Sequence, residues 1–138
     1  MAKFGRTGGD KQSMSKYNAK KAIVDGIEFD SRKEANRYFE LKLLQRAGAI
    51  KDLELQKAFE LIPAQREPDT IGKRGGVIKG KTIEQAVTYR ADFFYTDAKT
   101  GEKICEDING FKGGGAYAVF TIKRKLMLHK YGIKIKEI

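Results

Sequence analysis

The chain has 138 residues and a formal net charge of +10 at pH 7, and it contains one cysteine and one histidine. This length fits a single domain with a core of its own, and the lone cysteine and histidine exclude an intramolecular disulfide and the usual zinc sites. Because the sequence has neither a secretory signal segment nor a long apolar run, we expect a cytoplasmic protein with no membrane partner.

The positive charge is concentrated at the two ends of the chain. Residues 1–21 carry +5 and residues 112–138 carry +6, which leaves the middle near −1. A basic surface around a mildly acidic centre suits a polyanion that must bring a phosphate to a metal site. A lysine-rich surface that only interacts with water explains the charge equally well.

The first 20 residues are rich in Gly, Ser, Lys and Asn and contain few apolar positions. This composition predicts a flexible basic N-terminal segment, followed by one domain over residues 21–138. At the start of that domain, Asp25-Gly26 predicts a hairpin turn between two short extended segments.

The clearest predicted helix runs from Ser31 to Ala47, and Gly48 is well suited to end it. Its predicted apolar stripe consists of Ala35, Tyr38, Phe39, Leu41, Leu43 and Leu44. Glu34 lies on the same side as Tyr38, which is unusual for a carboxylate. It can form a capping box with Ser31, and this role leaves it free to face a metal site as well.

The stretch from Ile50 to Ile62 predicts one or two strands, with a break near Gln56-Lys57. A basic, glycine-rich segment follows at about residues 64–84, and it predicts either a long loop or a hairpin. Within it, Gly75–Thr82 matches the phosphate-loop pattern GxxxxGK[ST]. That pattern needs a buried strand before it and a helix after it, and neither is predicted here. We therefore expect no nucleotide hydrolysis.

The most informative stretch comprises two extended segments, Val87–Tyr95 and Ile104–Ile108, around turn residues at Asp97–Gly101. Side chains alternate between the two faces of a strand, so Asp92 and Asp107 can meet on one face if these strands pair. A carboxylate in so apolar a strand is costly to bury unless it is paired or holds a cation. Two converging carboxylates suit Mg²⁺.

The same alternation predicts the surroundings of this pair. The opposite face of the first strand would carry Tyr89, Ala91, Phe93 and Tyr95. Glu106 would point away from Asp107, which favours Asp107 as the acid that meets Asp92. The alternative for both aspartates is exposure at the strand ends, or ion pairing with Arg90 and Lys103.

The last predicted elements are a helix from Tyr117 to Tyr131 and a short strand from Ile133 to Ile138. The apolar members of this helix are Val119, Phe120, Ile122, Leu126 and Met127. The predicted order of elements is a hairpin, a helix, strands, the basic segment, two strands, a helix and a strand. This order predicts a mixed α/β fold.

The order of the acidic residues and elements resembles the PD-(D/E)xK nuclease superfamily. This order is a helix with Glu34, a strand with Asp92, the run Glu106–Gly110 and a basic helix. Within this superfamily, the chain is similar to a phage-associated branch that resembles Holliday-junction resolvases. The similarity extends from about residue 21 onwards and is carried by FDSRKEANRYFEL, YRADFFY and EDING. The resemblance implies an α/β, restriction-endonuclease-like fold with a mixed central sheet flanked by helices. It also implies a metal-dependent endonuclease that acts on branched DNA, as a homodimer, in phage recombination or packaging.

Carried over by position, the resemblance assigns Mg²⁺, with Mn²⁺ as a substitute, to Asp92, Asp107 and the carbonyl of Ile108. Glu34 matches the additional helix carboxylate of the resolvase-like members. The motif proline is replaced by Ala91, which is a mild departure.

Asn109 is the serious departure, because the family pattern has a water-activating lysine at that position. An amide can hydrogen-bond water or phosphate, but it supplies no positive charge. Three explanations remain open. The site is degenerate and only binds nucleic acid, the residue was substituted to stop turnover, or another lysine reaches the site, with Lys112, Lys123 and Lys125 as the candidates.

The candidate contacts to DNA phosphates are Arg74, Lys79, Lys81, Lys112, Lys123, Arg124 and Lys125. Such contacts would give salt-dependent affinity and little base specificity. The main alternative function is a non-catalytic nucleic-acid-binding module on a degenerate nuclease fold. A basic structural protein with ion-paired aspartates is the second alternative.

Overall fold

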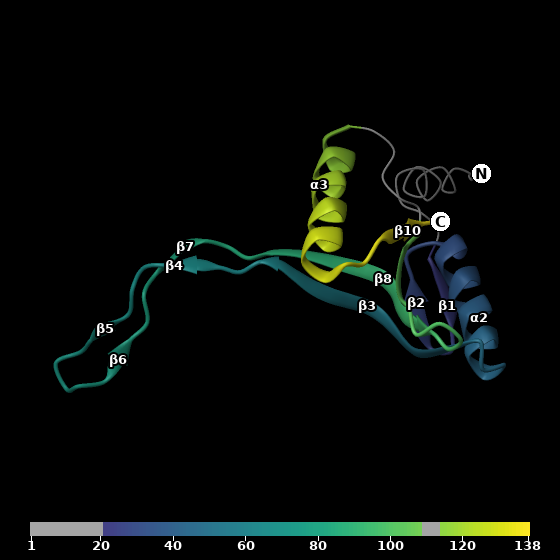
Figure 1. Cartoon of the computed structure of the whole chain (residues 1–138), viewed down its shortest axis with the longest axis horizontal. Coiled ribbons are helices and arrows are strands. Elements are labelled where there is room, and N and C mark those ends of the chain that lie inside the picture. The colour runs from purple at the N-terminus through teal and green to yellow at the C-terminus, as the bar shows by residue number, and fades with distance from the viewer. Residues whose placement is uncertain (1–20, 109–113) are drawn as a thin grey trace, which may run out of the picture.

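The computed structural model describes residues 21–108 and 114–138 (Figure 1). The predicted flexible N-terminal segment (residues 1–20), Asn109 and Lys112 lie outside these residues. No helix in the described ranges is long and apolar enough to cross a membrane.

The centre of the molecule is a four-stranded mixed sheet in the order β10-β9-β8-β3. Strand β3 (Ile50–Ile62) pairs antiparallel with β8 (Val87–Asp97), which pairs antiparallel with β9 (Lys103–Asp107). Helix α3 (Gly114–Tyr131) then connects β9 to the parallel strand β10 (Ile135–Glu137). The predicted mixed α/β class is therefore confirmed.

The N-terminal part of the described chain is a hairpin followed by a helix. Strands β1 (Ala22–Val24) and β2 (Ile27–Phe29) are joined by Asp25 and Gly26, both with left-handed backbone (φ 54° and 76°) as a two-residue hairpin turn requires. Helix α2 (Arg32–Arg46) follows, and the hydroxyl of Ser31 accepts a hydrogen bond from the Glu34 N–H at 3.1 Å.

Both helices bury narrower stripes than their sequences predict. In α2, Ala35, Tyr38 and Leu41 are buried, but Phe39, Leu43 and Leu44 are 57%, 45% and 39% exposed. In α3, Phe120 and Met127 are buried, whereas Val119 and Ile122 are 53% and 59% exposed. Each helix packs one side against its core, so apolar residues on its other sides remain in water.

The buried residues form two hydrophobic cores, one with α3 and one with α2 and the β1–β2 hairpin. The prediction that Tyr89, Ala91, Phe93 and Tyr95 share one face is wrong in detail. Tyr89 and Ala91 belong to the α3 core, and Phe93 and Tyr95 belong to the α2 core.

Strand β8 thus passes from one core to the other at Asp92, which lies between Ala91 and Phe93. On β3, the partners of Ala91 and Phe93 are Lys57 and Leu55, and Gln56 between them has a left-handed φ of 54°. Strict alternation fails here because the backbone of the pair is irregular at this point. The break predicted near Gln56 is therefore an irregularity within one continuous strand.

Between β3 and β8 the chain forms a long hairpin that projects from the body, and we call residues 63–86 the arm (Figure 1). Strand β4 (Gln65–Arg66) pairs with β7 (Thr82–Glu84), and β5 (Thr70–Ile71) pairs with β6 (Val77–Ile78). Of the two alternatives for this segment, loop or hairpin, the structure has the hairpin. The phosphate-loop-like stretch Gly75–Thr82 forms its return strand and leads into β7 and β8 rather than into a helix.

Candidate active site

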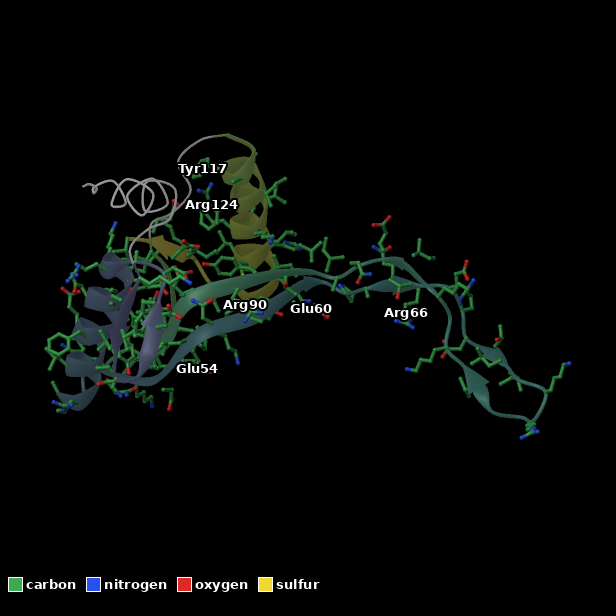
Figure 2. All side chains as sticks on the ribbon, turned by 180° about the vertical axis from the view of Figure 1, so that it is seen from behind. Glu54, Glu60, Arg66, Arg90, Tyr117 and Arg124 are labelled. Carbon is green, nitrogen blue, oxygen red and sulfur yellow. The ribbon has the colours of Figure 1, made fainter. Side chains whose placement is uncertain are left out.

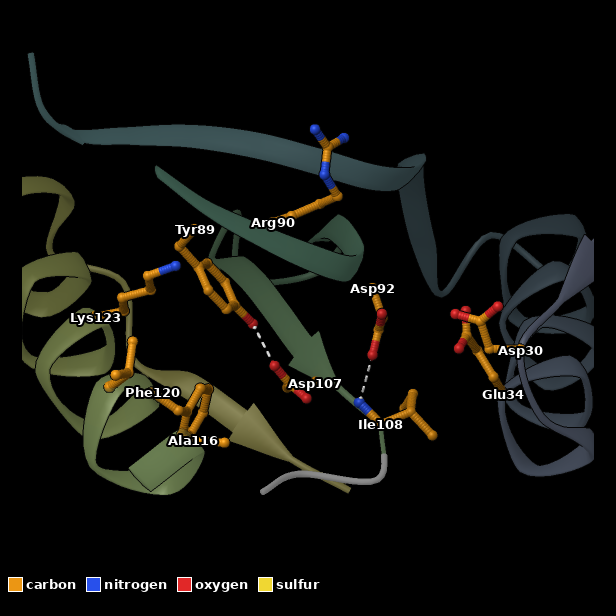
Figure 3. A pocket seen from close by; sticks show the side chains of 11 residues that line it. Asp30, Glu34, Tyr89, Arg90, Asp92, Asp107, Ile108, Ala116, Phe120 and Lys123 are labelled. Carbon is orange, nitrogen blue, oxygen red and sulfur yellow. Dashed lines mark hydrogen bonds between the residues drawn. The ribbon is translucent and has the colours of Figure 1, made fainter. Parts of the chain in front are cut away.

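Asp92 and Asp107 lie next to each other where β8 and β9 pair. The register places Phe93 opposite Glu106, so the two aspartates are neighbours across the ladder. Asp92 Oδ2 accepts a hydrogen bond from the Ile108 N–H at 2.8 Å, and Asp107 Oδ2 accepts one from the Tyr89 hydroxyl at 3.0 Å (Figure 3). The chain thus places the two predicted acids together and holds each of them by hydrogen bonds.

These residues line a cavity of about 590 Å³ between the sheet, α2 and α3 (Figure 3). Glu34 enters from α2, and Asp30 enters from the segment between β2 and α2. Lys123 and Val119 enter from α3, and Arg90 enters from β8. The full lining is Asp30, Glu34, Tyr89, Arg90, Asp92, Asp107, Ile108, Ala116, Val119, Phe120 and Lys123.

Three carboxyl groups of the pocket hold their protons more tightly than usual. Burial, with the nearby charges of Asp92, Asp30 and Asp107, raises the pKa of Glu34 to about 7. Burial and the charge of Asp92 raise the pKa of Asp107 to about 6, although the Tyr89 hydrogen bond opposes this shift. Burial also raises the pKa of Asp92, against the hydrogen bonds it accepts from Ile108 and Gln56.

Burial is the largest cause of all three pKa shifts, and no ion pair within the described residues opposes it. Among the described residues, Glu34, Asp92 and Asp107 form no ion pair. Their mutual repulsion and burial would both be offset by a bound cation. The predicted alternative in which the aspartates pair with Arg90 and Lys103 is not what the structure has, since Lys103 instead donates to the Thr96 hydroxyl at 3.0 Å.

Two cationic side chains, Lys123 and Arg90, line the pocket. In Figure 3, Lys123 lies on the side away from Glu34, and the Arg90 guanidinium is directed toward β3. Arg90 is held by a hydrogen bond from its guanidinium to the Gln56 carbonyl at 3.1 Å, and Lys123 extends from α3. Neither side chain forms an ion pair within the described ranges. The pocket therefore has an acidic side suited to a cation and a basic side suited to an anion such as phosphate.

Glu106 faces the other way, as the alternation of strand residues predicts. Its carboxylate is fully buried and accepts two hydrogen bonds from Arg37 of α2, at 2.7 Å from Nε and 2.5 Å from the terminal nitrogen. The Tyr95 hydroxyl donates a third bond. This network fixes β9 to α2, so that Asp107 rather than Glu106 faces the pocket.

The other predicted site residues are distributed over the molecule. Arg74, Lys79 and Lys81 lie on the arm and do not line the pocket. Arg124 pairs with Glu137 at 3.5 Å, and with Lys125 it lines a separate hollow beside β10. Of the three lysines considered as substitutes for the motif lysine, Lys123 lines the pocket, Lys125 does not, and Lys112 lies outside the described residues.

Four polar residues that line or support the pocket were missing from the predicted site: Asp30, Gln56, Tyr89 and Arg90. Asp30 directly precedes the helix cap Ser31, so its closeness to Glu34 could have been inferred from the sequence. Gln56 donates to Asp92 at 3.1 Å because β3 pairs with β8, and that pairing has no local signature.

The oxygen ligands suit a hard divalent cation, although the carboxylates alone do not form a complete cage. No group of three or more His, Cys, Asp or Glu side chains in the described part of the chain is arranged to hold a metal ion. A set of Asp92, Asp107 and the Ile108 carbonyl needs only two carboxylates, because Mg²⁺ usually retains several water ligands. The observation that fits a cation here is that Asp92 and Asp107 adjoin each other without an ion-pair partner among the described residues.

A family model described as "Protein of unknown function (DUF1064)" matches residues 14–137. The chain belongs to this family. The match spans the pocket and the arm alike. No curated protein and no solved structure gives a significant match.

Proposed function

We propose that this DUF1064 protein is a metal-dependent endonuclease that hydrolyses phosphodiester bonds in DNA, with branched DNA as its substrate. The observation that carries the proposal is the division of one pocket into an acidic side with Asp92, Asp107 and Glu34 and a basic side with Arg90 and Lys123. The resemblance to PD-(D/E)xK nucleases adds the restriction-endonuclease-like fold, the homodimer and the phage origin to the proposal.

Asp92, Asp107 and the Ile108 carbonyl are the residues that would hold Mg²⁺ or Mn²⁺, with Glu34 beside them. Bound there, the ion would lower the pKa of a water ligand and offset the charge of the scissile phosphate. Glu34 beside the ion is the carboxylate that would accept the proton of that water. As the resemblance implies, cleavage would leave a 3′ hydroxyl and a 5′ phosphate.

Lys123 is the best candidate for the positive charge that Asn109 does not provide. Its ammonium lies on a flexible stem that reaches the pocket from α3, and it is free of ion pairs among the described residues. Arg90 lies across the pocket and offers a planar guanidinium, which suits two oxygens of one phosphate. We assign substrate phosphate binding to Arg90 and stabilisation of the developing charge to Lys123.

The second candidate function is a nucleic-acid-binding module without catalysis, and Asn109 is the observation that favours it. In that case the pocket would still bind a phosphate and a cation, but no bond would break.

Cleavage of a labelled four-way junction and of a matched linear duplex, in Mg²⁺ and in Mn²⁺, tests the proposal. We expect the natural sequence to cut the junction and Asp107→Asn to abolish cutting. Lys123→Gln should lower the rate roughly 10²-fold, the usual loss when one stabilising donor is removed. Lys125→Gln is the matched control, because Lys125 lies on the same helix but outside the pocket, and it should change the rate less than threefold.

An Asn109→Lys variant separates the two functions. If it alone cuts, the site lacks only the motif lysine, and Lys123 does not replace it. If no variant cuts and all bind junctions, the non-catalytic module is correct. Equal losses for Lys123→Gln and Lys125→Gln would remove Lys123 from the chemistry.

A further inference from the structure

The arm belongs to neither hydrophobic core. Within the described chain, its strands β4 to β7 pair only with one another. Its apolar residues Ile71, Val77, Ile78 and Ile83 are between 55% and 70% exposed. Figure 2 shows the arm extending from the body beyond Arg66, with its side chains in solvent. Such an element contributes little to the stability of the body, so its apolar surface needs another explanation.

The arm nevertheless has a defined shape. Gly80 packs so closely on the opposite strand that a Cβ at this position would lie 1.7 Å from the Glu67 carbonyl oxygen. Its N–H donates to the Asp69 carboxylate at 2.9 Å, and the Glu67 N–H donates to the Lys81 carbonyl at 2.8 Å. At the tip, Gly75 adopts a left-handed φ of 84°, which suits a residue without a side chain.

The outer part of the arm carries a strong local excess of positive charge. Residues 70–83 contain Lys73, Arg74, Lys79 and Lys81 and no acidic residue. All four are exposed, and none forms an ion pair within the described residues. This surface therefore suits a negatively charged partner that also accommodates isoleucine and valine side chains.

We propose that the arm lies in a groove of duplex DNA that flanks the branch point, as a binding site separate from the pocket. A two-stranded ribbon fits the major groove, which is about 12 Å wide. Lys73, Arg74 and Lys79 contact phosphates along its edges, while Ile71 and Val77 contact sugars and thymine methyl groups. The inference depends on the proposed function only for the identity of the polyanion.

The length of the arm sets the distance at which it contacts DNA. Arg74 precedes Asp92 by 18 residues, so full extension at about 3.3 Å per residue limits their separation to roughly 60 Å. At about 3.4 Å per base pair this is at most about 17 base pairs. A contact at the tip therefore lies within about 17 base pairs of the cleavage site, and a junction with 25 base pairs of duplex on each side includes every position that the tip can reach.

The test compares binding to junctions with 8-base-pair arms and with 25-base-pair arms, without divalent cations. The tip variant is Lys73→Gln, Arg74→Gln and Lys79→Gln together. The control variant, Arg46→Gln, Lys51→Gln and Lys99→Gln, removes the same charge near the end of the sheet remote from the arm, where Lys51 pairs with Thr96. Circular dichroism and melting curves establish that both variants fold.

We expect the tip variant to lose at least tenfold in affinity for long junctions and less than threefold for short ones. Its slope of log K against log salt should fall by about 2 to 3, since each lost phosphate contact removes about 0.9. The control variant should lose the same small factor in affinity for short and for long junctions. The proposal is overturned if the natural protein binds short and long junctions with equal affinity. It is also overturned if the tip variant loses the same factor in affinity for both junction lengths, the result expected if the arm contacts an acidic protein instead.

The failure of this inference and the failure of the proposed function give different results. If no junction is cut but long ones are bound through the tip, the arm site stands and the catalytic proposal fails. If short and long junctions are cut at equal rates by the natural protein and by the tip variant, catalysis stands and the arm site fails.

Discussion

At the scale of single residues, the acidic side of the pocket makes the stability of the fold depend on pH. Glu34, facing Asp30, Asp92 and Asp107, has a pKa of about 7, and Asp107 has a pKa of about 6. In the unfolded chain these groups titrate near 4. The folded protein therefore binds more protons between about pH 4 and pH 7, and these groups lower the free energy of unfolding as the pH rises through that window.

We expect the natural protein to lose several degrees of melting temperature between pH 5.5 and pH 8, and Glu34→Gln to lose less. The amide cannot ionise, so the variant lacks the largest of these shifts. Differential scanning calorimetry at fixed ionic strength measures the difference, and parallel pH profiles would contradict the assigned shift.

The same pocket predicts an effect of Mg²⁺ with the opposite pH trend. An ion that binds only the folded state stabilises it by about 2.7 kcal/mol at a concentration of 100 times its Kd. Protons compete for the carboxylates, so the rise in melting temperature should be larger at pH 8 than at pH 5.5. Asp92→Asn with Asp107→Asn should abolish it. Superimposed melting curves with and without Mg²⁺ at pH 8 would contradict the metal site.

The sequence predicts those parts of the site whose residues lie close together along the chain, and it does not predict contacts between distant segments. The facing of Asp92 and Asp107 needs only the alternation of strand residues and one tight turn, and both can be inferred from residues 87–108. The contribution of Gln56 depends on the register between β3 and β8 across the whole arm, which no local pattern specifies. The sequence predicts Arg90 only as an ion-pair partner, because an exposed strand arginine has no local signature of phosphate binding.

At the scale of elements, the attachment of α2 to β9 depends on a buried ionic network. Glu106 is fully buried and is neutralised by Arg37, with a further hydrogen bond from Tyr95. We predict that Arg37→Ala lowers the free energy of unfolding by about 3 to 5 kcal/mol, because it leaves a buried carboxylate without its partner. Urea denaturation at pH 7 measures the loss.

Arg124→Ala is the matched control, because it breaks the partly exposed pair with Glu137 and should cost about 0 to 1 kcal/mol. Equal losses in the two variants would show that the Arg37 pair is no more important than a surface ion pair. Because β9 carries Asp107, Arg37→Ala should also weaken Mg²⁺ stabilisation, whereas Arg124→Ala should not.

The elements themselves were predictable from the sequence, but their buried sides were not. The hairpin at Asp25-Gly26, both helices and the strands of the sheet follow from turn residues, caps and periodicity. Phe39, Leu43 and Leu44 share helical spacing with the buried residues of α2, so sequence spacing alone cannot distinguish an inner stripe from an outer one. The split of β8 between two cores likewise depends on the irregular backbone at Gln56 of the paired strand β3.

At the scale of the whole molecule, two cores and the sheet between them form the body, and the arm is an appendage. The pocket lies where the two cores meet at Asp92, so its geometry is set by the body. In the proposed function, the arm contacts DNA at a distance from the pocket. If so, the recognition of substrate length and the cleavage chemistry are separable, and changes in the arm should leave the pocket intact.

An arm-shortened variant tests this separation. Arg66 pairs with Thr82, so replacing residues 67–81 with Asn-Gly closes β4 and β7 with a two-residue hairpin turn. The removed residues contribute nothing to either core, and shortening the connection lowers the entropy cost of closing it only slightly. The melting temperature should change by less than about 3 °C, which for a body of this size corresponds to less than about 1 kcal/mol.

Phe59→Ala is the contrasting variant, since it removes a buried ring from the α3 core and should cost about 3 to 5 kcal/mol. The arm-shortened protein should still bind 8-base-pair junctions as the natural protein does and gain nothing from longer ones. A loss of stability comparable to that of Phe59→Ala would mean that the arm packs against the body in solution. It would then be part of the folded core rather than free to follow a DNA groove.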